Sequence, residues 1–270
     1  MANLLPDGID AEGFIVTVPD RPLQTEFQGV VEDVVTTLTS RFAPLLDGLY
    51  LYGSVAHGRA RPGLSDLDLS LVLRASASTD DSAALENLRC ALQARHPEVS
   101  KIDFDLGTRA EVLAPRNRLA WGYWLRHECR WLWGEDLSAR FERLRPSRAI
   151  ALAVNGDFEP ALTAYARRIA DADDRAASLR LQREASRKLI RSTSVLRTDS
   201  DLDWPKTLDA HAALLRRHHP SMAASMRFFL AQALEPTAPA EVFVARLEEF
   251  SAWMARETAA RSDTGQAPVR

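Results

Sequence analysis

The chain has 270 residues, of which 46% are hydrophobic and 26% charged, and this composition excludes a disordered or fibrous protein. Its net charge of −3 disfavours nucleic acid as a partner, because proteins that bind long polyanions usually carry a basic domain. The sequence contains no apolar run of about 18 residues, so we predict no membrane span, and we expect no secretory signal. Two cysteines, Cys90 and Cys129, are too few for a disulfide framework, so we expect a cytoplasmic protein with reduced thiols.

The first 110 residues alternate between helical and strand patterns. Apolar residues recur at helical spacing or in strand-like runs, and the runs end at glycine or proline. The order predicts an α/β (α+β) domain with a mixed sheet. The expected elements are a helix over 25–40, strands over 49–52 and 67–73, a helix over 80–96 and a strand over 101–106.

From about residue 117 onward, only helical patterns remain. Pro146 and the pair Asn155-Gly156 interrupt them, which favours a domain boundary near 140–157. We therefore predict a first domain over 1–150 and an all-α helical bundle over 151–270. The expected helices cover 117–133, 158–172, 176–197, 206–217, 221–234 and 240–260.

Residues 51–73 carry the first sign of chemistry. A strand ends in Gly53-Ser54, and after a loop of 11 residues Asp66 and Asp68 open the next strand. Glycine lets a phosphate approach the backbone closely, and Ser54 adds a hydroxyl donor. Carboxylates at i and i+2 of a strand face the same side, where they repel each other unless a cation lies between them. Mg²⁺ binds one or two such carboxylates together with phosphate oxygens.

A third strand offers two further carboxylates, Asp103 and Asp105, again at i and i+2. If this strand lies beside the strand of Asp66 and Asp68, one of them joins the pair. That residue could bind a second metal ion or accept a proton from an attacking hydroxyl.

Together, residues 49–106 resemble the catalytic core of the DNA polymerase β-type nucleotidyltransferase superfamily. Its signature is an apolar strand, Gly-Ser, a spacer and then Asp–apolar–Asp–apolar. The resemblance implies that Gly53 and Ser54 hold a triphosphate and that Asp66 and Asp68 bind Mg²⁺. A basic–apolar–Asp–apolar run supplies the family's third carboxylate, and Lys101-Ile102-Asp103-Phe104 matches it, which favours Asp103 over Asp105.

Residues 184–219 resemble the helical domain of streptomycin/spectinomycin adenylyltransferases, where a helix with Arg leads through a loop to Lys and an Ala-rich helix. By that comparison Lys206 matches a triphosphate-binding lysine, and we expect it at the opening of a helix. Lys188 and Arg191 lie at i and i+3 on one helix face and could also reach a phosphate. The alternative for all three is an ordinary solvated helix face.

These observations favour an Mg²⁺-dependent enzyme that moves a nucleoside monophosphate from an NTP, with ATP preferred, to a hydroxyl of a small molecule such as an aminoglycoside. Trp121, Trp124, Trp131 and Trp133 could stack on a base or on the acceptor, or they could simply pack in the core. One alternative is a nucleotidyltransferase of a toxin–antitoxin type that modifies a protein or an RNA. A non-catalytic module with a degenerate fold is the other.

Overall fold

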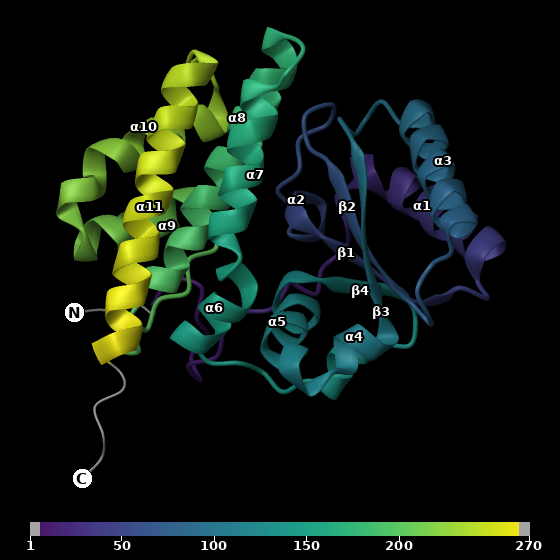
Figure 1. The fold of residues 1–270 in the computed structure, drawn as a ribbon. Helices are drawn as coiled ribbons and strands as arrows, with labels where there is room; N and C mark the ends of the chain where they lie inside the picture. The colour runs from purple at the N-terminus through teal and green to yellow at the C-terminus, as the bar shows by residue number, and fades with distance from the viewer. Residues whose placement is uncertain (1–5, 265–270) are drawn as a thin grey trace. The chain divides into compact units, whose positions relative to one another are not determined.

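Within residues 6–264, which the computed structural model describes, four strands form one mixed sheet with the order β3-β2-β1-β4 (Figure 1). The neighbours β1/β2 and β1/β4 are antiparallel, whereas β2 and β3 run parallel. This sheet and its helices confirm the predicted α/β (α+β) class. The strands are β1 (Leu46–Tyr52), β2 (Leu67–Leu73), β3 (Ile102–Thr108) and β4 (Arg130–Gly134).

The chain forms two units. One comprises residues 15–144 and contains the sheet; the other comprises residues 1–14 and 145–270 and is helical. The N-terminal residues therefore belong to the helical unit, although the rest of that unit follows the sheet in the sequence.

One face of the sheet is covered by α1 (Thr25–Phe42) and α3 (Thr79–Arg95). Leu49, Leu51 and Leu69 point to this face and are completely buried against the apolar stripes of the two helices. Because side chains alternate along a strand, Tyr50 and Val72 point to the opposite face, where they pack with Val112 and Leu125. Asp68 shares this second face, since it lies an even number of residues from Val72.

Short helical segments complete the unit. Thr108 and Glu111 form a reciprocal cap at the start of the helix over Arg109–Leu113, so β3 ends and this helix begins at once. These segments are α2 (Gly53–Ala56), α4 (Arg109–Leu113), the 3₁₀ turn η1 (Pro115–Asn117), α5 (Arg118–Tyr123), the π turn η2 (Trp124–Glu128) and the 3₁₀ turn η3 (Leu137–Arg140).

The predicted helix over 117–133 is wrong in its second half. Helix α5 ends at Tyr123, and a π turn leads into β4, which pairs with the exposed edge of β1. Trp131 and Trp133 have high strand propensity, and a strand satisfies the backbone groups that β1 would otherwise leave unpaired. The helical periodicity of the segment was therefore overridden by the open sheet edge.

The helical unit is built around a cluster of aromatic side chains. Phe229 contacts Phe228, Phe243 and Phe250 with ring centroids 5.1–5.7 Å apart, and all three ring pairs are edge-on. The helices are α6 (Arg148–Asn155), α7 (Phe158–Ala170), α8 (Arg175–Ser192), α9 (Leu208–His218), α10 (Ala223–Leu234) and α11 (Ala240–Thr264), with the 3₁₀ turns η4 (Thr193–Leu196) and η5 (Pro220–Met222).

The predicted helices of this unit are present, with three differences. The helix expected over 176–197 ends at Ser192 and continues as the 3₁₀ turn η4. Helix α6 was not predicted, and the helix expected from residue 206 begins at Leu208, because the Thr207 side chain accepts a hydrogen bond from the Ala210 amide and so caps it. Within residues 6–264 we find no helix that is long and apolar enough to cross a bilayer.

We predict that Phe229→Ala lowers the free energy of unfolding of the helical unit by about 3–5 kcal/mol, because the fully buried ring leaves a cavity. Leu234→Ala is the matched control, since Leu234 on the same helix is 72% exposed and should cost less than about 0.5 kcal/mol. Chemical denaturation followed by circular dichroism measures both, and equal losses would contradict this account of the core.

Candidate functional site

Gly53 occupies a position that other residues cannot share. It follows β1 with φ = +74°, a conformation that disfavours a Cβ atom. A Cβ built on it would also lie 2.1 Å from the Asp68 carboxylate oxygen Oδ2. The antiparallel pairing of Tyr52 with Asp68 fixes this closeness. Glycine is therefore required here both by the turn and by the carboxylate beside it.

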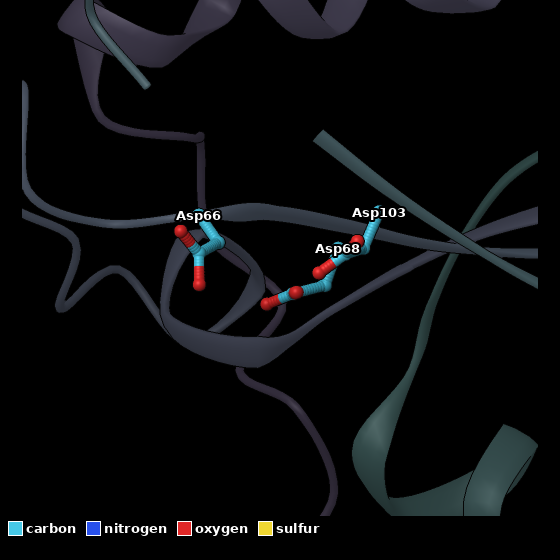
Figure 2. A group of neighbouring side chains, drawn as sticks. All are labelled: Asp66, Asp68 and Asp103. Atoms are coloured by element: carbon cyan, nitrogen blue, oxygen red, sulfur yellow. The ribbon is translucent and has the colours of Figure 1, made fainter. Parts of the chain in front are cut away.

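Three carboxylates meet next to this glycine. Asp68 lies in β2 and is in register with Asp103 of the parallel strand β3, while Asp66 directly precedes β2 rather than lying within it. One ligand oxygen from each of the three lies within 4.8 Å of the others (Figure 2). The structure thus brings together the predicted residues Asp66, Asp68 and Asp103, which we call the acidic triad.

Neighbouring polar groups hold the acidic triad in place. The Ser100 hydroxyl donates to Asp66 Oδ1 at 2.5 Å, and the Lys101 ammonium lies 2.7 Å from Asp103 Oδ1. Two like charges 4 Å apart near a protein surface repel by about 4 kcal/mol, so a divalent cation among the three oxygens relieves a large cost. Oxygen ligands of this kind suit hard cations such as Mg²⁺. The acidic triad could therefore hold a metal ion.

Asp105, the alternative third carboxylate, lies outside the acidic triad. It is in register with Ser70, whose hydroxyl lies 3.5 Å from Asp105 Oδ2 and accepts a hydrogen bond from Trp124 Nε1 at 2.8 Å. Desolvation by the surrounding protein raises the pKa of the Asp105 carboxyl above its ordinary value. Asp105 is therefore a further carboxylate on the same face of the sheet, next to Ser70 and Trp124, while the catalytic role expected of Asp103 stays a prediction.

Tyr52 is an unpredicted neighbour of the acidic triad. Burial raises the pKa of its hydroxyl, and the negative charges of Asp68, Asp105 and Asp103 raise it further. Its ring packs edge-on against Trp124 with centroids 4.7 Å apart. The alternation along β1 could have placed Tyr52 on the face of Asp68, but only the β1/β2 register shows that the two are opposite one another.

The four tryptophans of residues 121–133 differ in their surroundings. Trp121 and Trp124 pack against the cluster of Tyr50 and Val72, whereas Trp133 packs against the core on the other side of the sheet. Trp131 is 48% exposed. Three of the four tryptophans thus pack against the core of the unit. Among them, Trp124 donates its indole N–H to Ser70, which lies beside Asp105.

The loop after Gly53 is tied to the π turn. His57 Nε2 lies 3.5 Å from Glu128 Oε2, and the Tyr123 hydroxyl donates to Oε1 of the same carboxylate. Arg21 donates to the carbonyl oxygen of His57 at 2.6 Å. These contacts fix α2 and so support the turn at Gly53.

Lys188, Arg191 and Lys206 belong to the helical unit. The Lys188 ammonium lies 2.7 Å from Asp157 Oδ1, and Arg191 is an exposed residue in the last turn of α8. Lys206 lies in the loop two residues before α9 rather than at the first position of the helix. Their contact with a triphosphate stays a prediction.

Comparison with known proteins finds similarity in structure alone. No protein-family model matches the chain, and no curated protein matches its sequence. The chain is similar in fold to the spectinomycin adenyltransferase AAD(9) from Enterococcus faecalis, whose crystal structure contains ATP and spectinomycin. The two share 13% sequence identity with a TM-score of 0.58, over 86% of this chain and 98% of that one.

We predict that Gly53→Ala disrupts the acidic triad, because the new methyl group must displace the Asp68 carboxylate. The affinity of the acidic triad for Mn²⁺, measured by isothermal titration calorimetry, should fall at least about tenfold in this variant. Gly63→Ala is the control: Gly63 has φ = +72° but open space around it, so only the backbone cost of about 1–2 kcal/mol in unfolding free energy applies. A Gly53→Ala variant that binds Mn²⁺ as tightly as Gly63→Ala would refute this reading of the turn.

Proposed function

We propose that this protein is an Mg²⁺-dependent nucleotidyltransferase that moves a nucleoside monophosphate, AMP in the first instance, from an NTP to a hydroxyl of a small molecule such as an aminoglycoside. The observation that carries the proposal is the acidic triad, with oxygens within 4.8 Å of one another beside the positive-φ turn at Gly53. The likeness to an adenyltransferase whose structure contains ATP and spectinomycin supports the same reaction class.

The residues at the site fit a divalent ion, because three carboxylates each offer an oxygen ligand within 4.8 Å of the others. Asp66 and Asp68 would hold the ion. When bound, Mg²⁺ would polarise the triphosphate and stabilise the charge that develops on the leaving pyrophosphate.

The chain's own groups would do the remaining work. The bare backbone at Gly53 and the hydroxyl of Ser54 would receive the triphosphate. Asp103 would accept the proton of the acceptor hydroxyl as that oxygen attacks the α-phosphorus and the bond to pyrophosphate breaks. Lys188, Arg191 and Lys206 would add positive charge against the triphosphate. That part of the proposal rests on the resemblance of residues 184–219 to adenylyltransferases.

A cationic, sugar-like acceptor fits the surroundings of the acidic triad. Asp105 and Asp103 present negative charge along β3, and Tyr52 and Trp124 add aromatic surface beside them. Opposite charge attracts a polycation, and aromatic rings accommodate the apolar faces of a sugar. This combination favours an aminoglycoside over a neutral alcohol.

The reaction is tested by pyrophosphate release from ATP, GTP, CTP or UTP with Mg²⁺ and a panel that includes streptomycin and spectinomycin. We expect turnover with ATP and at least one aminoglycoside, and loss of turnover with EDTA. Release that requires an added protein or RNA would instead support a toxin–antitoxin type of enzyme, and no release with any acceptor would reject catalysis.

We predict that Asp68→Asn lowers kcat by at least about a thousandfold, because it removes a charged ligand of the metal that stabilises the transition state. Asp103→Asn should lower kcat by about 10²–10⁴-fold through loss of the proton acceptor. Asp105→Asn, two residues along the same strand, is the matched control and should keep kcat within about tenfold. Full turnover in Asp68→Asn would reject the mechanism, and a larger loss in Asp105→Asn than in Asp103→Asn would reverse the assignment of the third carboxylate.

A further inference from the structure

A small cavity lies inside the helical unit, between α9 and the 3₁₀ turn η4. It is partly open to solvent, and its enclosed part has room for about one group the size of a water molecule. Leucines line it together with six polar residues, and among these described lining residues there is no Asp or Glu. The polar ones are Thr193, Ser194, Arg197, His211, His218 and His219.

Arg197 is the buried cation of this cavity. Its side chain is completely buried, and its Nη2 donates to the carbonyl oxygens of Asp201 and, at 3.0 Å, Asp203. The guanidinium also lies 4.7 Å from the centre of the Trp204 ring. These contacts engage one nitrogen and one face of the guanidinium, and they fix its position.

The loop that follows Arg197 is tied on two sides. The Trp204 amide donates to the Asp7 carbonyl at 2.7 Å, and the Asp7 amide donates to Asp203 Oδ1 at 3.1 Å. Asp203 Oδ2 accepts a hydrogen bond from Arg217 of α9 at 2.8 Å. Because its backbone partners are held in this way, Arg197 cannot turn outward into water without breaking several contacts.

The remaining donors of Arg197 have no acceptor in the protein. Its Nε and Nη1 are buried without a hydrogen-bond partner among residues 6–264, and no carboxylate in that range forms an ion pair with it. The nearby Asp201 carboxylate instead accepts from the Thr198 amide and from His218 Nε2, both at 2.7 Å. A buried charged donor without an acceptor is costly, so these N–H groups favour a ligand that accepts hydrogen bonds.

Other groups that line the cavity are also donors. His219 Nε2 lies 3.2 Å from Arg261 Nη2, and since arginine only donates, the imidazole proton is on Nδ1. Ser194 Oγ accepts from Asn155 Nδ2 at 3.3 Å, which leaves its own proton to donate. Burial lowers the pKa of His219, and the charge of Arg261 lowers it further, although Glu257 opposes this. The lining is therefore rich in donors and in positive charge.

We propose that this cavity binds a small monatomic anion, chloride in the first instance, through Arg197. A guanidinium keeps its charge at every pH at which the protein is folded, and an anion both neutralises that charge and accepts from several donors at once. The space suits a group little larger than water and excludes one as large as phosphate. The bound anion would stabilise the loop before α9. The inference is independent of the proposed function.

The test is thermal unfolding of the full chain at constant ionic strength, with sodium chloride replacing sodium gluconate. An anion that binds only the folded chain raises its melting temperature, by roughly 2–4 °C when chloride rises from about 1 to about 100 mM. Arg197→Met should lose this dependence. Arg217→Met is the matched control, because it removes the same charge from an exposed arginine of the same region that does not line the cavity.

Bromide provides a second measurement that needs no variant to fold. In crystals of the wild-type chain soaked in sodium bromide, we expect an anomalous peak in contact with Arg197. Equal melting temperatures in chloride and gluconate would overturn the proposal, whether the crystals then show a water molecule at this position or binding at crystal concentration only. A larger Arg197-dependent rise with inorganic phosphate than with chloride would overturn the assignment to a monatomic anion.

Discussion

The parallel, in-register pairing of β2 with β3 is the constraint on which the site depends. It places Asp68 directly beside Asp103 and Ser70 beside Asp105. A shift of one residue would turn the carboxylates of one strand toward the buried helices α1 and α3 and bring apolar side chains to the other face. The buried leucines of β2 and Ile102 of β3 oppose such a shift, since each would lose its place in the core. The energy of the hydrophobic core thus maintains an arrangement of charges that would otherwise repel one another.

The sequence of the first 110 residues predicts most of this fold. The predicted strands over 67–73 and 101–106 differ from the observed ones by two residues or fewer at each end, whereas the strand predicted over 49–52 begins three residues earlier, at Leu46. Alternation along the strand does not distinguish Asp103 from Asp105 as the third carboxylate, because both side chains lie on the same face. The register with Asp68, which depends on packing far along the chain, is what separates them.

Other features could not be predicted locally. Residues 130–134 form a strand because β1 presents an open edge, a tertiary requirement that no short window of sequence contains. Tyr52 approaches the acidic triad through cross-strand pairing, and Arg197 meets Trp204 within a loop that has no periodic pattern. The contact of Asp7 with Trp204 joins residues almost 200 positions apart, and sequence periodicity carries no information about it.

The assignment of the N-terminal residues to the helical unit means that the polypeptide passes between the units twice, once after residue 14 and once after residue 144. The two passages are adjacent, because the Ile15 amide donates to the Leu144 carbonyl at 2.9 Å. A fragment that starts at residue 145 would consequently lack the backbone partners of Trp204 and Asp203. A circular permutant of these 270 residues that joins residue 270 to residue 1 through a flexible linker and opens the chain between residues 14 and 15 would retain them in one continuous segment.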